Sequence, residues 1–378
     1  MTTLLKPDSF KVAIGNIKTN IFGMAFINTV TRENVIRSAI LTEIFLNSSK
    51  LFKTPVEINR RLNSMRGAVY NVGVCRKGDS LCLTVTLETL KSVTENEARA
   101  FLDDIIFKPM VYEDAFETKI FNRATDTVRK RILSYKDDKK AYAAQRCLEE
   151  MFDHNGYGVP DDGYIEDIDK VDTEGLYGYY SKLISSANID KGIVGEKPLE
   201  RVSVCDGIKD ITENMGAAQG RLCMGYCAEE ADETALSVLN EIIGGSAGSK
   251  LFNEVREKEN LCYYVNSVMH RFKNIIMVQA GIDKKARDKT EAIIEKSVEK
   301  LKKEITKEDV TKAKTTVKNI YLHKADNPYG RVDEMIDIAL YGKKMAMDNR
   351  MQRLENIDEE DVLKALDSLK LKTKYFLG

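Results

Sequence analysis

The chain has 378 residues, roughly two to three times the length of a typical domain, which predicts two domains with sizeable cores. Its Lys and Arg number 58 against 59 Asp and Glu, a balance that argues against binding to nucleic acid or an anionic membrane surface. The segment MTTLLKPDSFKVAIGN lacks the pattern of a signal peptide, and no apolar run approaches the ~18 residues of a membrane span. We therefore expect a cytoplasmic protein with no membrane or nucleic-acid partner.

In the first half, apolar periodicity predicts helices at about 33–47 and 55–66, the second ending at Gly67 as a left-handed cap. The segment LCLTVTL alternates apolar and polar residues and pairs with AVYNVGV across the turn Lys77-Gly78-Asp79. Four more helices follow, at about 94–108, 113–134, 139–152 and 172–186. The first half ends with a short strand in IDKGIVG.

The second half repeats this order. A strand, RLCMGYC, precedes a helix at 230–243, a glycine loop at 244–248 and a helix ending near Glu259. The strands LCYYVNSV and IIMVQAGI come next, and then helices at about 283–303, 306–324, 328–341 and 358–368 and the strand KTKYFLG.

The repeated order predicts an α+β fold of two similar domains, each a mainly antiparallel sheet covered by helices. We place the first domain at 1–198, a linker at 199–216 and the second domain at 217–378, because Pro198, Gly207 and Gly216 break the pattern between the halves.

Histidines and cysteines do not form a metal or disulfide pattern. The three histidines, His154, His270 and His323, are far apart in sequence, and neither H-E-x-x-H nor H-x-x-E-H occurs. Seven cysteines, an odd number, fit reduced thiols better than a disulfide framework. No resident metal or other cofactor is therefore expected.

The loop GGSAGSK differs from a phosphate-binding loop because Ser249 separates its glycine from its lysine and because it joins two helices. A flexible connection is the better interpretation. Downstream, SKLFNEVREKENLCYYVNS places Arg256 at a helix end, Asn260 at the break and Tyr263 in the next strand. On spacing alone, Arg256 is explained by the helix C-terminus and Tyr263 by the core.

This string resembles the second-domain signature of the pitrilysin/insulinase-type metallopeptidases, which include the mitochondrial processing peptidase subunits. A glycine-rich loop precedes the matching positions Ser249, Leu251, Phe252, Val255, Arg256, Lys258, Leu261 and Tyr263. In the first half, TPVEINRRLNSMRGAVYNVGV is similar to the segment after the zinc helix of that family, and the resemblance covers nearly the whole chain.

The zinc motif implied by the resemblance is missing. H-x-x-E-H would fall near Leu41, Ile44 and Phe45, which offer no metal ligand, and Glu43 is out of register. The third ligand would fall around 126–131, a segment without Glu. Glu43 itself is interpreted as a solvated helix residue.

The resemblance implies a catalytically incomplete subunit of a heterodimeric zinc peptidase, inactive alone. It would supply Arg256 and Tyr263 to the carbonyl of a peptide substrate in the active site of a zinc-bearing homologue, and bind extended peptide at a sheet edge. The alternative is a non-proteolytic peptide-binding or scaffold protein. An independent enzyme with other chemistry is the weakest hypothesis, because the sequence shows no recognisable pair of nucleophile and base. The sequence leaves open whether the isolated chain forms a homodimer.

Overall fold

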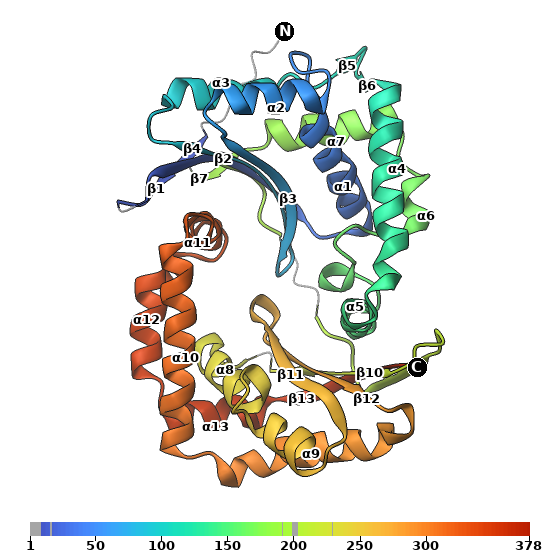
Figure 1. Ribbon diagram of the computed structural model, residues 1–378, viewed down its shortest axis with the longest axis vertical. Helices are drawn as coiled ribbons and strands as arrows, with labels where there is room; N and C mark the ends of the chain where they lie inside the picture. Colours follow the sequence, from blue (N-terminus) through green and yellow to red (C-terminus); the bar gives the residue numbers. More distant parts are fainter. Residues whose placement is uncertain (1–8, 16, 191, 199–202, 229) are drawn as a thin grey trace. The chain divides into compact units, whose positions relative to one another are not determined.

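The computed structural model describes residues 9–15, 17–190, 192–198, 203–228 and 230–378 (Figure 1). The chain forms two compact units, and each is assembled from separate stretches of sequence. The first unit comprises Met1–Ser134, Val159–Arg201 and Lys324–Ala346, and the second comprises Tyr135–Gly158, Val202–His323 and Met347–Gly378.

The first unit is built on a six-stranded sheet of order β3-β4-β2-β8-β7, with β1 paired to β2. Every pairing in it is antiparallel except that of β2 with β8. Its elements are β1 (Phe10–Ala13), β2 (Thr19–Thr29), α1 (Arg32–Asn47), α2 (Pro55–Ser64), β3 (Val69–Lys77), β4 (Ser80–Leu90), α3 (Glu95–Ile106), β5 (Val111–Tyr112), β6 (Ala115–Phe116), α4 (Thr118–Ser134), α6 (Ile165–Ile168), α7 (Thr173–Ser185), β7 (Asn188–Asp190), β8 (Ile193–Gly195) and α11 (Pro328–Tyr341).

Both faces of this sheet are buried, and the two faces have separate cores. On one face, α1, α3, α4 and α7 pack on apolar residues that include Phe22, Met24 and Leu87. On the other face, α11 packs Val332 and Ile336 against a cluster that includes Ile21. Because β2 is covered on both sides, eight of its residues in a row are buried, and no apolar and polar alternation remains.

The second unit is built on a five-stranded sheet of order β11-β12-β10-β13-β9, in which only the β13–β9 pairing is parallel. Its strands are β9 (Lys209–Glu213), β10 (Gly220–Cys227), β11 (Cys262–His270), β12 (Ile275–Ile282) and β13 (Lys370–Leu377). Its α-helices are α5 (Lys139–Met151), α8 (Glu233–Asn240), α9 (Arg287–Glu304), α10 (Lys307–Asp326), α12 (Met347–Asn356) and α13 (Glu359–Ser368). Two π-helical segments, η3 (Glu241–Gly245) and η4 (Phe252–Lys258), precede β11.

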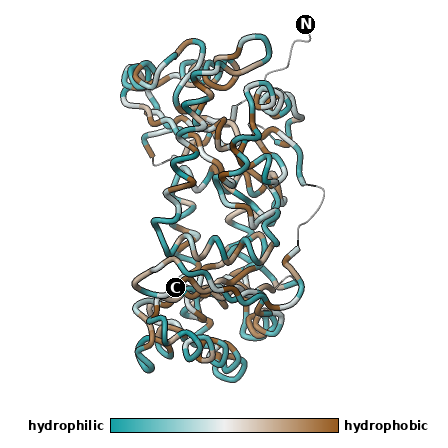
Figure 2. The backbone as a smooth tube through the Cα atoms, turned by 90° about the vertical axis from the view of Figure 1, so that its right-hand side faces the viewer, coloured by the Kyte–Doolittle hydropathy of each residue, from teal (hydrophilic) through white to brown (hydrophobic). Residues whose placement is uncertain are grey.

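The α+β prediction is confirmed. Each sheet has a hairpin at one edge, β3–β4 in the first unit and β11–β12 in the second, and the next strand in the sheet is the first long strand of that half of the sequence, β2 or β10. The compact units nevertheless differ from two contiguous halves of the sequence. Helix α11 lies in the first unit because its apolar face completes that core, and α5 lies in the second unit for the same reason. The hydropathy colouring in Figure 2 shows helices that alternate between hydrophobic and hydrophilic residues, as helices with one buried face do.

Part of the predicted linker is structured. Residues 199–202 lie outside the described residues, but Lys209–Glu213 forms β9 and pairs with the C-terminal strand β13. The segments absent from the sequence prediction include the strands β1 and β2 and the helices α6 and α12. The helix expected at 113–134 is shorter because Val111–Phe116 forms a small hairpin, β5–β6, before α4.

Candidate functional site

The positions that would hold zinc ligands in the first unit belong to its hydrophobic core. Leu41, Ile44 and Phe45 lie on α1, whose N-terminus is capped by the Thr31 side chain. Their exposed fractions are 0%, 0% and 1%, and all three belong to the cluster between the sheet and its helices. These side chains offer no nitrogen or oxygen to a metal, so the residues present do not fit the zinc ion that the resemblance implies.

Glu43 lies on the same helix and is also buried, so its interpretation as a solvated residue is wrong. Only 8% of it is exposed. Its Oε1 accepts a hydrogen bond of 2.6 Å from Nη1 of Arg131 on α4, and Arg131 also forms a 2.7 Å ion pair with Asp162. Burial acts to lower the pKa of Arg131, but the two carboxylates outweigh it and raise that pKa. A fixed side-chain cation therefore neutralises the buried carboxylate.

Arg131 lies within the segment where the third zinc ligand was sought. Among the residues that the structure describes, no group of three or more His, Cys, Asp or Glu is arranged to hold a metal ion.

Arg256 lies in the second unit on the π-helical segment η4. The segment ends at Lys258, and Asn260, two residues later, has a left-handed φ of +52°, as expected for the break in the chain. The amide of Leu261 donates to the carbonyl of Val255 at 3.1 Å, which closes the helix end and turns the chain into β11. π-Helical turns are rare and often occur at functional sites.

Tyr263 lies at a β-bulge at the start of β11. Cys262 pairs with Ile282 and Tyr264 pairs with Gly281, so Tyr263 is the extra residue between two paired positions. It is 58% exposed, which excludes the core position that spacing alone favoured. A bulge of this kind changes the direction of a side chain without ending the strand.

Arg256 and Tyr263 flank one helix-to-strand connection, and η4 packs against β11. The Arg256 side chain is exposed, and its guanidinium lies 5.0 Å from the ring centre of Phe252. Within the described residues, neither the Arg256 guanidinium nor the Tyr263 hydroxyl has a hydrogen bond or ion pair. Both groups are therefore available as hydrogen-bond donors to a ligand.

The glycine segment before η4 was predicted to be a flexible connection, but its first two glycines belong to the π-helical segment η3, and Gly244 packs closely against β11. A Cβ at Gly244 would lie 2.7 Å from the amide nitrogen of Ser267, and one at Gly245 would lie 2.5 Å from the carboxylate of Glu241. A side chain at Gly244 would clash with the backbone of β11, whereas one at Gly245 would require the Glu241 carboxylate to move. Burial raises the pKa of the Glu241 carboxyl.

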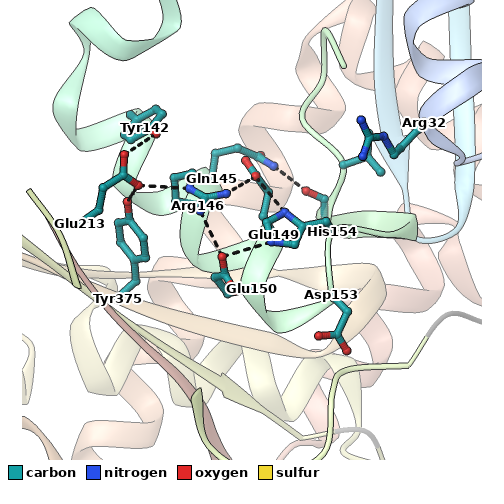
Figure 3. A network of polar contacts seen from close by, with 12 residues as sticks. Arg32, Tyr142, Gln145, Arg146, Glu149, Glu150, Asp153, His154, Glu213 and Tyr375 are labelled. Carbon is teal, nitrogen blue, oxygen red and sulfur yellow. Dashed lines mark hydrogen bonds and ion pairs between the residues drawn. The ribbon is translucent and has the colours of Figure 1, made fainter. Parts of the chain in front are cut away.

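A polar network on α5 was not found by the sequence reasoning (Figure 3). Arg146 forms ion pairs of 2.5 Å with Glu149, 3.1 Å with Glu150 and 3.4 Å with Glu213 on β9. The hydroxyl groups of Tyr142 and Tyr375 donate to Glu213 at 2.8 and 2.5 Å.

This network fastens α5 to strands β9 and β13 of the second unit, and His154 contacts Glu149 and Glu150 at its other end. Its carboxylates are already paired with cations or phenols, so we interpret it as structural. The sequence could have indicated part of this network, because Glu149 and Glu150 lie three and four residues after Arg146, the spacing of ion pairs on one helix face.

Comparison with known proteins supports the resemblance. Residues 178–317 match the family described as "Peptidase M16 inactive domain". The chain is 27% identical over 383 residues to "Probable inactive metalloprotease YmfF" of Bacillus subtilis, a match that covers 92% of this chain and 90% of that protein. It is 24% identical over 285 residues to "Uncharacterized zinc protease YmxG" of the same organism, covering 68% of this chain and 65% of that protein.

The fold is also that of a solved structure, a conserved protein from Enterococcus faecalis V583. The two chains superpose with a TM-score of 0.86 and 22% identity over 98% of each. No helix among the described residues is long and apolar enough to span a membrane. The matches agree with the prediction of an inactive peptidase homologue. The chain is therefore similar over residues 178–317 to the inactive domain of M16 peptidases, and over most of its length to a probable inactive metalloprotease, and its sequence contains no H-x-x-E-H motif.

Proposed function

We propose that the chain is the non-catalytic subunit of a heterodimeric zinc peptidase, and that Arg256 and Tyr263 bind the substrate carbonyl in the active site of a zinc-bearing homologue. One contrast carries the proposal. The residues that we align with the zinc ligands are buried in apolar core, whereas Arg256 and Tyr263 are exposed and have unoccupied donor groups.

The proposed chemistry needs only the two donors that this chain retains. A guanidinium and a phenol aimed at a peptide carbonyl stabilise the negative charge that develops on its oxygen during attack by water. The partner would supply the metal that activates this water. Removing one such donor from an active site typically costs about 10²- to 10³-fold in turnover.

The choice of partner is supported by the relatives. In Bacillus subtilis, one protein similar to this chain is named a probable inactive metalloprotease and another is named a zinc protease. We infer that this chain, like the inactive relative, pairs with a zinc-bearing homologue, and that the pair is cytoplasmic. Cell fractionation with an antibody against this chain tests the location.

The test is co-expression with a zinc-bearing homologue from the same organism, that is, one carrying H-x-x-E-H. We expect the two chains to co-purify, the complex to hold one zinc per heterodimer, and peptide cleavage to require both chains. The proposal would be overturned for that pair if the zinc-bearing chain alone cleaves peptide as fast as the two chains together. It would also be overturned if the two chains do not associate at micromolar concentration. Zinc analysis of this chain alone is the control and should give no stoichiometric metal.

A second candidate is a peptide-binding or scaffold protein without cleavage. The observation that favours it is that β3 and β11 lie at the edges of their sheets and carry exposed apolar residues, Val69 on β3 and Val268 on β11. An edge strand can pair with an extended peptide. This second function would be favoured if the chain binds a peptide and the peptide stays uncleaved when each zinc-bearing homologue of the organism is added.

A further inference from the structure

Two cysteines of the first unit lie directly opposite each other on neighbouring antiparallel strands. Cys75 on β3 is the register partner of Cys82 on β4. Opposed residues in such a pair have Cα atoms about 4.5–5.5 Å apart and side chains on one face, and a disulfide requires a Cα separation of about 4.4–6.8 Å. The backbone is therefore already placed for a disulfide bridge.

The two thiols have different surroundings. Cys82 is 0% exposed and lies in the apolar cluster between the sheet and α11, whereas Cys75 is exposed on the edge strand β3. The hydrogen bond with Cys82, aided by the Lys77 ammonium, lowers the pKa of the Cys75 thiol. The same contact and burial raise the pKa of Cys82 well above its ordinary value. Cys75 is thus the thiol that a solvent-borne reagent meets and the one that ionises first.

The hairpin that carries both cysteines is held in place by ionic and polar contacts. Lys77, two residues after Cys75, forms ion pairs with Asp333 and Asp337 on α11, and the Tyr341 hydroxyl donates to the Lys77 carbonyl. These contacts fix the end of β3 to α11, and the β3–β4 ladder, which is paired from Val69 to Lys77, keeps Cys75 opposite Cys82.

The remaining cysteines provide an internal comparison. Cys147 and Cys223 also lie near each other, in the second unit, but both are buried. Cys227 and Cys262 are buried as well, and Cys205 is half-buried. Among the seven cysteines, all of which the structure describes, only Cys75 is an exposed residue with a second cysteine directly opposite it.

We propose that Cys75 and Cys82 form a reversible redox site that takes a low-molecular-weight disulfide, such as oxidised glutathione, as its oxidant. The Cys75 thiolate attacks one sulfur of that disulfide, whose S–S bond breaks and releases one glutathione thiolate. Cys82 then attacks the Cys75 sulfur, loses its proton to solvent and expels the second glutathione thiolate. In sum, two protein thiols are oxidised and one external disulfide is reduced to two thiols. The new bond ties the edge strand β3 to β4.

The sequence between the two cysteines makes the test direct. The full chain is incubated with oxidised glutathione, free thiols are blocked with N-ethylmaleimide, and the chain is digested with trypsin without reduction. Cleavage after Arg76 and Lys77 separates fragment Gly67–Arg76 from fragment Gly78–Lys91, each with one cysteine. We expect these fragments as one linked pair, lighter by two hydrogens than their sum and separated by dithiothreitol, while the other five cysteines are alkylated after unfolding.

Two serine variants test the order of attack. In Cys82→Ser the oxidation should stop at a mixed disulfide between glutathione and Cys75, and in Cys75→Ser residue Cys82 should stay a free thiol. A Cys205→Ser variant is the matched control and should form the linked pair like the wild type. A wild-type chain that accumulates only the Cys75 mixed disulfide, links Cys75 to a second copy of the chain, or leaves both thiols unmodified would overturn the proposal.

Discussion

The guanidinium of Arg131 donates a 2.6 Å hydrogen bond to the carboxylate of Glu43 and so joins α4 to the helix on which the zinc ligands of an active relative would lie. This ion pair satisfies a buried negative charge on α1. The charge of Glu43 is thus balanced within the chain, and apolar residues of the same helix belong to the core.

Replacing Arg131 with methionine should lower the free energy of unfolding by about 1–3 kcal/mol, because Glu43 would stay buried without its cation. Urea denaturation at pH 7 measures the loss. Arg129→Met is the matched control, since Arg129 on the same helix pairs with the exposed Asp169, and it should cost at most ~1 kcal/mol. Equal losses in the two variants would show that the buried carboxylate does not depend on Arg131.

Arg256→Ala and Tyr263→Phe should each reduce kcat of an assembled peptidase complex by about 10²- to 10³-fold, because each removes a donor to the developing oxyanion. The melting temperature should not change, since both side chains are exposed and unpaired within the described residues. Tyr112→Phe is the control for the phenol, because Tyr112 is also 58% exposed and lies in the first unit. Full activity in the double variant would leave both residues without a catalytic role.

Asp333 gives a pH-dependent contribution to stability. Burial acts to raise its pKa, but the ammonium groups of Lys77 and Lys324 outweigh it and lower that pKa to about 2 from the ordinary 3.8. A depressed carboxyl pKa stabilises the fold above the unfolded pKa, and this stability is lost as the pH falls toward the folded value. Asp333→Asn should therefore be less stable than the wild type at pH 6, with a difference that shrinks between about pH 4 and pH 2.

Urea midpoints measured at several pH values give this difference directly. Asp126→Asn, which changes an exposed aspartate on α4, is the control and should match the wild type across the range. A difference for Asp333→Asn that stays constant down to pH 2 would contradict the assignment of the stability to its charge.

Tyr375→Phe should lower the free energy of unfolding by about 1–3 kcal/mol, because it removes a partly buried 2.5 Å hydrogen bond to the Glu213 carboxylate. The network that fastens α5 to β9 and β13 would then rely on Tyr142 and Arg146. Thermal or urea unfolding measures the effect, and Tyr112→Phe is again the neutral comparison. A Tyr375→Phe chain as stable as the wild type would mean that α5 is held by its apolar contacts alone.

Local signals in the sequence predicted many elements well. The helix at 328–341 was predicted with its observed bounds, because Asn327 caps it, Pro328 occupies its first turn and Gly342 ends it with a φ of +88°. The hairpin around Gly78 and the left-handed Gly67 were likewise found from residues close in sequence. Such features depend on short-range backbone geometry, which the residue types specify.

Features that depend on distant residues were not predicted. Glu43 was interpreted as solvated because its partner Arg131 is 88 residues away in the sequence. Strand β2 was missed because burial on both faces removes the alternation that identifies a strand, although its run of apolar residues was visible. The bulge at Tyr263 depends on pairing with β12, which the spacing between Arg256 and Tyr263 does not reveal.

The assembly of the first unit from separate stretches of sequence has a consequence for synthesis on the ribosome. Val332 and Ile336 of α11 cover the face of the first sheet that carries Phe10 and Ile21. Strands β1 and β2 are made early, but the helix that covers this face emerges only after most of the chain has been translated. Until then this apolar face of the nascent chain has no helix packed on it and stays exposed. We therefore expect the growing polypeptide to bind a chaperone that recognises hydrophobic segments.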